Sequence, residues 1–377
     1  MRTVRDIRVL ENIPVLVRAA LNVPVQNGVV TGSFRLRQAL PTIEYLRSRH
    51  ARVILIGHLG DRGTETLEPV YRAMQEMVPG IKFCPVTTGV RVREAVRALS
   101  PGDVLMLENL RRDPGEKRNA KEFAAALAEL ADIFVQDAFD VCHRAHASVV
   151  GVPELLPSYA GLLVAQEVRE LSAALSPKKP SIAIVGGAKF ATKEPVLVRL
   201  LASYDRVFVG GALANDFMQA SGRPIGRSLV SGADKAELKA LLGNRKLLLP
   251  VDYVVAPAGK TRVAGRLAEI QEVHADEAIL DNGPKTIAML SERIAGARTV
   301  LWNGPLGNYE NGFTEGTEAL AQILAASGAH AIVGGGDTVA AIEKLGLGSR
   351  FAFISTGGGA MLDFLAKGTL PGIAALR

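Results

Sequence analysis

The stretch SIAIVGGAK, residues 181–189, is a short apolar run rich in β-branched residues that leads directly into two glycines. The same order of apolar run, glycine or polar turn, and amphipathic helical stretch recurs along the chain. This alternation is typical of βα units in a parallel sheet, and runs that are apolar throughout are typical of strands covered on both faces. The sequence therefore predicts an α/β protein with doubly wound, Rossmann-like parallel sheets.

The expected strands fall into two sets. In the first part of the chain they are 15–18, 52–57, 104–107 and 133–135. In the later part they are 181–185, 206–209, 247–255, 299–302, 331–333 and 351–355.

The segment between these sets indicates a domain boundary. It begins with prolines, contains a long helical pattern and ends in Pro177-Lys178-Lys179-Pro180. A chain of 377 residues is long enough for two domains. We expect one domain over 1–157, a connecting helix over 158–175 and a second domain over 176–365, with a cleft between the domains. The alternative is an ordinary surface helix within one continuous domain.

Composition excludes several classes of protein. Hydrophobic residues make up 48% of the chain and charged residues 22%, which excludes disorder as the main state. The net charge of +6 is dispersed, aromatic residues are 5%, and two cysteines form no metal-binding pattern. No apolar run approaches the 18 or so residues of a membrane-spanning helix, and MRTVRDIRVLENIP lacks a signal-peptide core. We expect a cytoplasmic protein that binds neither nucleic acid nor membrane.

Glycine clusters follow the expected strands of the later part. They are Gly186-Gly187, Gly210-Gly211, Gly304 with Gly307, Gly334–Gly336 and Gly357–Gly359. Any one of them alone is most simply a tight turn. Clusters at equivalent strand ends favour phosphate or nucleotide binding, because helix N-termini at this edge offer free amides to anions. No GxxxxGK[ST] and no helix-opening GxGxxG occur, which disfavours a P-loop protein and a standard NAD-dependent dehydrogenase.

Charged residues beside these glycines are candidates for a nucleotide site. Lys189 and Lys193 are four residues apart, so on a helix starting there both would project from one face toward an anion. A solvated lysine face is the alternative. Asp337 and Thr338 follow three glycines, where Asp337 could cap a helix or hold Mg²⁺ against phosphates. Glu310 is a candidate acceptor for ribose hydroxyls.

The first part of the chain instead carries cations at loop positions, of which several together could bind a small polyanion. Taken singly, each is most simply a surface charge or an ordinary structural histidine. These residues are Arg18, Arg35, His58, Arg62, Arg111, His143, Arg144 and His146.

A set of segments in the same order resembles the phosphoglycerate kinase family over nearly the whole chain. The segments are VLVRAALNVP (15–24), SFRLRQALPTI (33–43), GHLG (57–60), LMLENLR (105–111), DAFDVCHRAH (137–146), GGAK (186–189), WNGPLGNYE (302–310), GGGDT (334–338) and STGGGA (355–360). GHLG or GGAK alone would be weak signals, whereas the combination is specific.

The resemblance implies reversible phosphoryl transfer between 1,3-bisphosphoglycerate and ADP, giving 3-phosphoglycerate and ATP. It places 3-phosphoglycerate on the first domain, Mg²⁺ with ADP or ATP on the second, and residues 366–377 back on the first domain. The substrate-binding residues that it implies are Asn22, Arg35, His58, Arg62, Arg111 and Arg144. The nucleotide-binding residues are Lys189, Lys193, Asn303, Glu310, Gly335, Gly336, Asp337 and Thr338, with Asp337 as the Mg²⁺ contact. Arg35, Lys189 and Gly358 are the expected catalytic residues.

Some positions depart from the family pattern. Ala20 stands where a substrate-binding carboxylate is usual, Asp61 replaces an arginine, Thr192 replaces an aspartate and Asp140 replaces a glycine. The chief alternative is therefore a non-catalytic nucleotide-binding relative with an altered substrate pocket. The enzyme is expected to work by closure of a hinge and to be a monomer.

Overall fold

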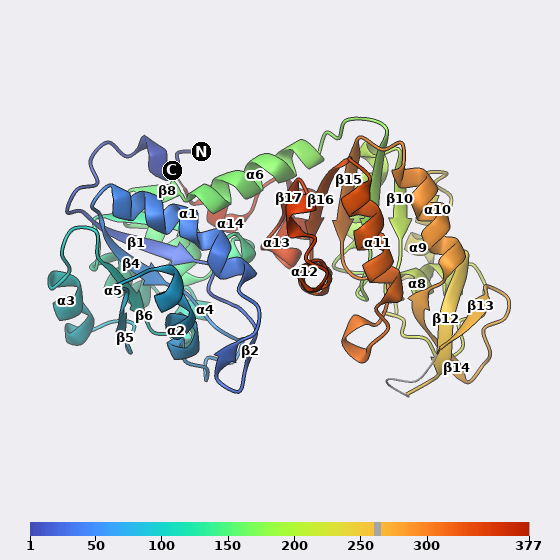
Figure 1. Ribbon diagram of the computed structural model, residues 1–377, viewed down its shortest axis with the longest axis horizontal. Helices are drawn as coiled ribbons and strands as arrows, with labels where there is room; N and C mark the ends of the chain where they lie inside the picture. Colours follow the sequence, from blue (N-terminus) through green and yellow to red (C-terminus); the bar gives the residue numbers. More distant parts are fainter. Residues whose placement is uncertain (260–264, 377) are drawn as a thin grey trace. The chain divides into compact units, whose positions relative to one another are not determined.

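The computed structural model describes residues 1–259 and 265–376. The chain divides into two compact units (Figure 1): unit 1 comprises Met1–Arg169 and the residues from Lys367 onward, and unit 2 comprises Glu170–Ala366. The chain leaves unit 1 within helix α6 (Leu162–Ala174) and returns to it at the end of α13 (Gly358–Lys367).

Unit 1 is built on a parallel sheet in the order β5-β6-β4-β1-β7-β8. Its strands are β1 (Pro14–Ala19), β4 (Arg52–Ile56), β5 (Lys82–Cys84), β6 (Val104–Leu107), β7 (Ile133–Asp137) and β8 (Ser158–Ala160). Its helices are α1 (Phe34–Ser48), α2 (Glu68–Met77), α3 (Val90–Arg97), α4 (Pro114–Lys117), α5 (Lys121–Ala128) and α14 (Pro371–Ala374), and a small hairpin joins β2 (Val25–Gln26) to β3 (Val29–Val30).

The strands of unit 1 are covered on both faces. Val15 and Val17 of β1 pack with residues of α1 and α2, whereas Leu16, between them, packs with residues of α3 and α5. Successive side chains of a strand point to opposite faces, so the run Val15–Val17 must be apolar throughout. In register, Val17 lies between Leu55 of β4 and Val135 of β7.

Unit 2 repeats this plan with the parallel order β11-β10-β9-β15-β16-β17. Its strands are β9 (Ser181–Val185), β10 (Arg206–Val209), β11 (Leu247–Leu248), β15 (Thr299–Asn303), β16 (His330–Gly334) and β17 (Phe353–Ile354). Its remaining helices are α7 (Glu194–Ser203), α8 (Ala212–Ala220), α9 (Lys235–Leu242), α10 (Pro284–Ile294), α11 (Glu315–Ala326) and α12 (Gly336–Lys344).

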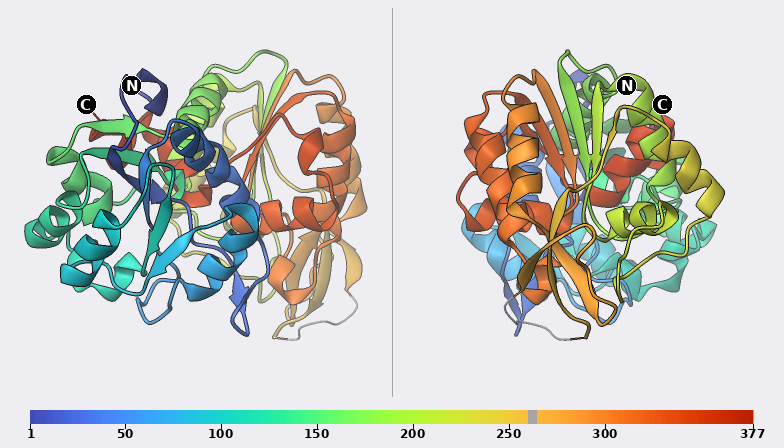
Figure 2. Two further views of the ribbon diagram at one scale, coloured as in Figure 1. Left: turned by 60° about the vertical axis from the view of Figure 1, so that its left-hand side comes forward. Right: turned by 90° about the vertical axis from the view of Figure 1, so that its right-hand side faces the viewer.

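Helices cover both faces of this second sheet as well. Ile182, Ile184 and Trp302 pack with residues of α10, α11 and α12. In the right-hand view of Figure 2, α8 and α9 (yellow-green) lie on the opposite side of the sheet from α10 and α11 (orange). The expected α/β fold with two Rossmann-like parallel sheets is confirmed.

A small antiparallel sheet in unit 2 was not expected. Its order is β13-β12-β14, with β12 (Asp252–Pro257), β13 (Arg266–Glu269) and β14 (Glu277–Asn282). The prediction of one strand over 247–255 is wrong, because this segment contributes β11 to the parallel sheet and the start of β12 to the antiparallel one. Pro250 lies between the two strands, and a proline cannot donate a backbone hydrogen bond within a sheet.

The helix predicted over 158–175 starts later than expected. Residues Ser158–Ala160 form β8, which pairs with β7, and α6 begins at Leu162. Two side chains fix this start: Thr42 Oγ1 accepts from the Leu162 amide at 2.9 Å, and Asp137 Oδ1 accepts from the Leu163 amide at 3.0 Å. Because both acceptors come from elsewhere in the chain, a periodicity argument could not locate the first turn.

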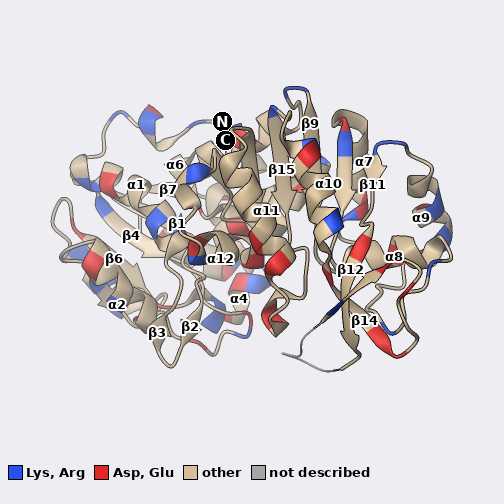
Figure 3. Ribbon diagram, turned by 45° about the vertical axis from the view of Figure 1, so that its right-hand side comes forward, with Lys and Arg blue, Asp and Glu red and all other residues tan. Residues whose placement is uncertain are grey.

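Charges of both signs are distributed over the two units. Figure 3 shows Lys and Arg interspersed with Asp and Glu along the described chain. Among the described residues, none of the helices has the length and apolar character needed to span a membrane.

Candidate active site

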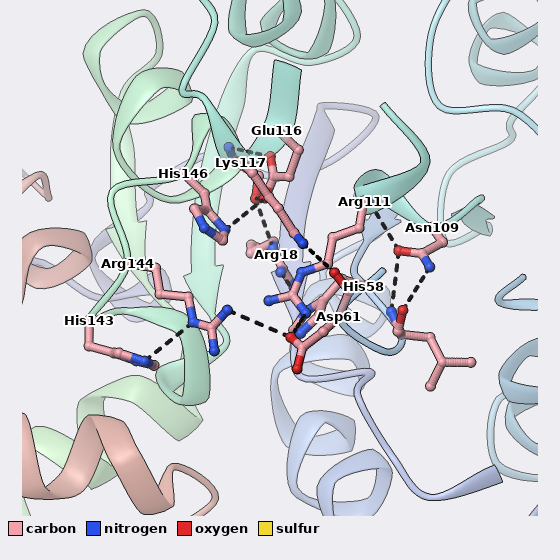
Figure 4. Close-up of polar contacts among 12 residues, drawn as sticks. Arg18, His58, Asp61, Asn109, Arg111, Glu116, Lys117, His143, Arg144 and His146 are labelled. Carbon is pink, nitrogen blue, oxygen red and sulfur yellow. Dashed lines mark hydrogen bonds and ion pairs between the residues drawn. The ribbon is translucent and has the colours of Figure 1, made fainter. Parts of the chain in front are cut away.

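Basic side chains gather at the carboxyl edge of the sheet in unit 1. Arg18 lies in β1, His58 follows β4, Arg111 lies in the helical turn Leu110–Arg112 after β6, and Arg144 follows β7. Because these strands are parallel, their carboxyl ends meet at one edge, where such sheets bind ligands. Figure 4 shows the side chains converging. Arg18, Arg111 and Arg144 are called the arginine cluster below.

Arg18 is the most deeply buried member of the cluster, with 1% of its surface exposed. Its Nε donates to Ser148 Oγ at 2.9 Å, and its Nη2 lies 2.9 Å from His58 Nδ1. A guanidinium group only donates, so His58 Nδ1 accepts and the neutral ring carries its proton on Nε2. Burial and the neighbouring guanidinium groups lower the pKa of His58 well below its ordinary value.

Glu116 supports this arrangement through Ser148, although its sequence context gives no sign of it. Its carboxylate is fully buried and accepts from Ser148 Oγ at 2.6 Å and from the Ser148 amide at 3.0 Å. Ser148 therefore connects Glu116 to Arg18. Glu116 lies in the first turn of α4, which Asp113 caps, and acidic residues are ordinary in that position.

Arg111 and Arg144 share a carboxylate. Arg111 Nη1 donates to Asp61 Oδ1 at 2.6 Å, and Arg144 Nη1 lies 3.8 Å from the same oxygen. Arg111 Nη1 also donates to the Gly60 carbonyl, and Lys117 Nζ donates to the Asp61 carbonyl. The Arg111 side chain is 2% exposed and that of Asp61 is 80% exposed. The departure at position 61 thus places an acid directly against two predicted substrate-binding residues.

Two further predicted residues adjoin the same loop. Asn22, beyond β1, accepts from the Gly60 amide through Oδ1 at 3.1 Å, and its carbonyl accepts from Arg35 Nη1 at 2.5 Å. Arg35 lies in the first turn of α1. Arg62 is exposed, and among the contacts of the described residues no hydrogen bond or ion pair joins it to the cluster.

The two other histidines considered from the sequence also lie here. His143 Nε2 accepts from Arg144 Nε at 3.3 Å. His146 Nδ1 is 3.8 Å from Glu116 Oε1. Burial and the charges of the arginine cluster lower the pKa of His146 to about 4, so this ring is neutral at physiological pH.

In unit 2, glycine turns pack backbone against backbone at the carboxyl edge of the sheet. The Gly186 amide donates to the Asn303 carbonyl at 2.8 Å, and the Gly187 amide donates to the Pro305 carbonyl at 3.1 Å. Gly304 has a φ of +92°, and a Cβ there would lie 2.6 Å from the Gly186 carbonyl oxygen. Glycine is therefore required at the join between the ends of β9 and β15.

These turns border a cavity of about 800 Å³, which is large enough for a nucleotide. Its lining includes Gly187, Lys189, Gly211, Glu310 and Asp337. The structure thus brings Lys189, Glu310 and Asp337, all predicted from the sequence, to one cavity at the carboxyl edge of this sheet.

Lys193 lies beside this cavity, but the predicted reason for its placement is wrong. Residues 186–193 form a loop, and α7 begins at Glu194, so Lys189 and Lys193 do not share a helix face. The Lys193 side chain instead turns back, and its Nζ is the atom that a Cβ on Gly187 would meet at 2.4 Å. Burial and the charge of Lys189 lower the pKa of Lys193 to about 8.

The other predicted nucleotide-side residues lie where β15, β16 and β17 end. Asn303 Nδ2 donates to the carbonyl of Gly358, the first residue of α13, at 3.4 Å. Gly335, with a φ of +106°, precedes α12, whose first residue is Gly336. Thr338 is fully buried in the first turn of α12, and among the described residues its Oγ1 has no hydrogen-bond partner. Asp337 lies in the same turn, and Gly335 rather than Asp337 occupies the capping position.

The carboxylates in the cavity fit Mg²⁺ bound together with phosphates. Burial and the charge of Glu310 raise the pKa of Asp337. A cation beside Asp337 would relieve both effects, and Mg²⁺ in phosphate sites commonly takes one or two carboxylates. Within residues 1–259 and 265–376, no group of three or more His, Cys, Asp or Glu is arranged to hold a metal by itself.

Comparisons with known proteins match almost the full chain to one family. The family model described as "Phosphoglycerate kinase" matches residues 4–368. The phosphoglycerate kinase of Pelotomaculum thermopropionicum is 44% identical over 389 aligned positions, covering 100% of this chain and 98% of the relative. That of Thermus thermophilus is 45% identical, covering 96% of each chain.

Solved structures show the same relationship. The phosphoglycerate kinase of Coxiella burnetii superimposes with a TM-score of 0.83 at 38% identity, covering 99% of this chain and 98% of that one. The enzyme of Pyrococcus horikoshii gives a TM-score of 0.90 at 30% identity, covering 100% and 98%. Sequence motifs, fold and relatives lead to one assignment, and the chain belongs to the phosphoglycerate kinase family.

Proposed function

We propose that this chain, a phosphotransferase of that family, transfers a phosphoryl group reversibly between 1,3-bisphosphoglycerate and ADP, yielding 3-phosphoglycerate and ATP. The observation that carries the proposal is the nucleotide-sized cavity in unit 2, where Lys189, Glu310 and Asp337 line a glycine-rich strand edge. Relatives with the same fold over nearly their whole length are named for this activity. Nothing in the names of these relatives favours the alternative of a non-catalytic nucleotide-binding protein.

Unit 1 is the proposed site for 3-phosphoglycerate. Guanidinium groups bind phosphate and carboxylate bidentately, and Arg111 and Arg144 come from two different strand ends, so together they can hold a small polyanion. His58 offers an Nε2 proton as a neutral donor, because its Nδ1 is occupied by Arg18. Asn22 and Arg35 complete the proposed set beside the Gly60 loop. We also assign Arg62 to substrate binding on the resemblance alone.

Unit 2 is the proposed site for the nucleotide. Lys189 and Lys193 face its phosphates, and Glu310 accepts from ribose hydroxyls at the rim of the cavity. Gly335, Gly336 and Thr338 belong to the start of α12, where free amides favour anions. Asn303 orients Gly358 and with it the start of α13. Asp337 is the proposed Mg²⁺ contact, and bound Mg²⁺ would neutralise negative charge on the phosphates.

The reaction requires positioning and neutralisation of charge rather than proton transfer. An oxygen of the ADP β-phosphate attacks the phosphorus of the acyl phosphate, and the bond from that phosphorus to the carboxyl oxygen breaks. The electron pair stays on the departing carboxylate, so no general base is needed. Arg35, Lys189 and the amides at Gly357–Gly359 are proposed to stabilise the charge on the transferred group.

Because the two substrates are assigned to different units, we propose that they meet only when the units close about a hinge, which also excludes water. Action as a monomer in the cytoplasm stays a prediction of the sequence.

Replacement of Arg35 tests the catalytic assignment. In a coupled assay of ATP formation from 1,3-bisphosphoglycerate with Mg²⁺, Arg35→Ala should lower kcat by about 10²–10⁵-fold, the range for single charge-stabilising groups. Arg37→Ala, on the exposed part of the same helix, is the matched control and should turn over normally. Near-normal turnover of Arg35→Ala would remove that residue from the mechanism, and ADP binding without any turnover of the parent chain would favour the non-catalytic alternative.

A further inference from the structure

Asp61 forms ion pairs with Arg111 and Arg144 that the proposed reaction does not require. We infer that its carboxylate is an internal anion that occupies the Arg111–Arg144 pair when no substrate is bound, and that the incoming substrate anion must displace it. On this inference, which rests on the proposed substrate site, Asp61 sets the affinity of unit 1 for phosphorylated ligands. Asp61 is then an affinity-determining residue, with no part in the chemical step.

The contact geometry supports displacement. Asp61 Oδ1 lies 2.6 Å from Arg111 Nη1 and 3.8 Å from Arg144 Nη1, so one oxygen serves both guanidinium groups. The Arg111 side chain is buried at 2% exposure, whereas that of Asp61 is 80% exposed. The carboxylate therefore approaches Arg111 from the solvent side, the direction from which a free anion must also arrive.

The backbone of Asp61 is held separately from its side chain. Lys117 Nζ donates to the Asp61 carbonyl, and Arg111 Nη1 donates to the neighbouring Gly60 carbonyl. The Gly60 amide is bonded to Asn22 at 3.1 Å. With the main chain fixed by these contacts, the Asp61 side chain can rotate into water while the loop keeps its place. An exposed carboxylate regains its hydration when it leaves, so displacement costs little.

The Asp61 carboxylate offsets positive charge in the arginine cluster. Burial and the charges of Arg144 and Arg18 lower the pKa of Arg111, so the guanidinium groups of the cluster repel one another. Both carboxylate oxygens of Glu116 accept hydrogen bonds from Ser148. Asp61 is the acid in ion-pair contact with Arg111 and Arg144, and a substrate phosphate could neutralise the same two groups in its place.

Titration with inorganic phosphate tests the inference without relying on turnover. Calorimetry should show that Asp61→Asn binds phosphate roughly 3- to 5-fold more tightly than the parent chain, as expected when a partly exposed competing ion pair is removed. Asp61→Ser should do the same. Asp61→Glu, which keeps the charge, should stay within about twofold of the parent.

Steady-state kinetics give a second readout. Asp61→Asn should lower the KM for 3-phosphoglycerate by a similar factor while kcat stays within about twofold, because only ground-state binding changes. Glu68→Gln is the matched control, since Glu68 is also an exposed acid of unit 1 paired with an arginine, Arg72, at 2.6 Å. This control should move neither constant.

The two proposals fail in different ways. Equal or weaker phosphate binding by both Asp61→Asn and Asp61→Ser overturns the inference, as does the absence of measurable phosphate binding in every protein. A parent chain that binds phosphate but makes no ATP overturns the proposed reaction, while the phosphate constants still decide the role of Asp61.

Discussion

Two histidines beside the arginine cluster are kept neutral by their surroundings. His58 accepts a hydrogen bond from Arg18, and His146 is half-buried among the same positive charges. A neutral ring avoids adding a further cation to an already positive site. The protonation state of each histidine is therefore part of how unit 1 accommodates three guanidinium groups.

The low pKa of His146 makes stability depend on pH. The folded pKa of about 4 lies below the ordinary value of 6.5, so the unfolded chain binds more protons between these limits. The stability contribution is complete above pH 6.5 and is lost as the pH falls toward 4. Between pH 7 and 5 the parent chain should lose about 1–2 kcal/mol more unfolding free energy than His146→Gln. Urea titrations at both pH values measure this, and parallel losses in the two proteins would contradict it.

The pKa of Lys193 predicts a different dependence, in nucleotide binding. Since this pKa is about 8, the positive charge of Lys193 is lost as the pH rises through that value. The dissociation constant for ADP should increase by about tenfold between pH 7 and 9. Lys193→Arg is the matched control, because a guanidinium group stays charged and should show little change. If calorimetry gives the parent chain and Lys193→Arg the same dependence of ADP binding on pH, Lys193 has no part in phosphate binding.

The glycine turns act as structural joints between strands. Gly304 combines a positive φ with a backbone approach that leaves no room for a Cβ. Gly304→Ala should lower the unfolding free energy by about 2 kcal/mol or more, because it adds both backbone strain and a clash with Gly186. It should also weaken ADP binding, because the turn borders the cavity. Gly296→Ala is the control, since a Cβ there meets nothing within 4 Å. Denaturant unfolding of both variants decides whether the turn is as constrained as its geometry indicates.

Most of the parallel strands could be predicted because they are apolar runs with a turn behind them, as in SIAIVGGAK. The three-residue strands β5 and β8 were missed, because such short segments carry no clear apolar run. The start of α6 could not be located, since it depends on Thr42 and Asp137 from distant parts of the chain. The same holds for the Arg111–Asp61 contact, which joins residues 50 positions apart. Sequence patterns locate the strand ends that carry the site, whereas pairings across the sheet edge follow from tertiary packing.

The C-terminal tail ties the chain back to unit 1 after unit 2 is complete. Leu370 is 1% exposed, and the Gly372 amide donates to the Cys142 carbonyl at 2.8 Å. A Cβ at Gly372 would lie 2.6 Å from a methyl group of Val149, so the tail fits closely. Leu370 and Gly372 are therefore buried within unit 1.

A chain that ends at Lys367 should consequently lose stability in unit 1 selectively. Burial of Leu370 alone is worth about 1.5–3 kcal/mol. Trp302, the single tryptophan, is fully buried in unit 2, so its fluorescence reports that unit. Circular dichroism of the shortened chain should show an early transition that precedes the change in fluorescence. Coincident transitions that match those of the full chain would show that the tail contributes nothing.

The contact of Gly372 with Cys142 leaves little slack in the chain after α13. Helix α13 ends at Lys367, and only residues 368–371 separate it from Gly372, whose amide donates to the Cys142 carbonyl two positions before Arg144. Four residues span a short distance even when fully extended, so α13 cannot shift far along its axis unless this anchor is released.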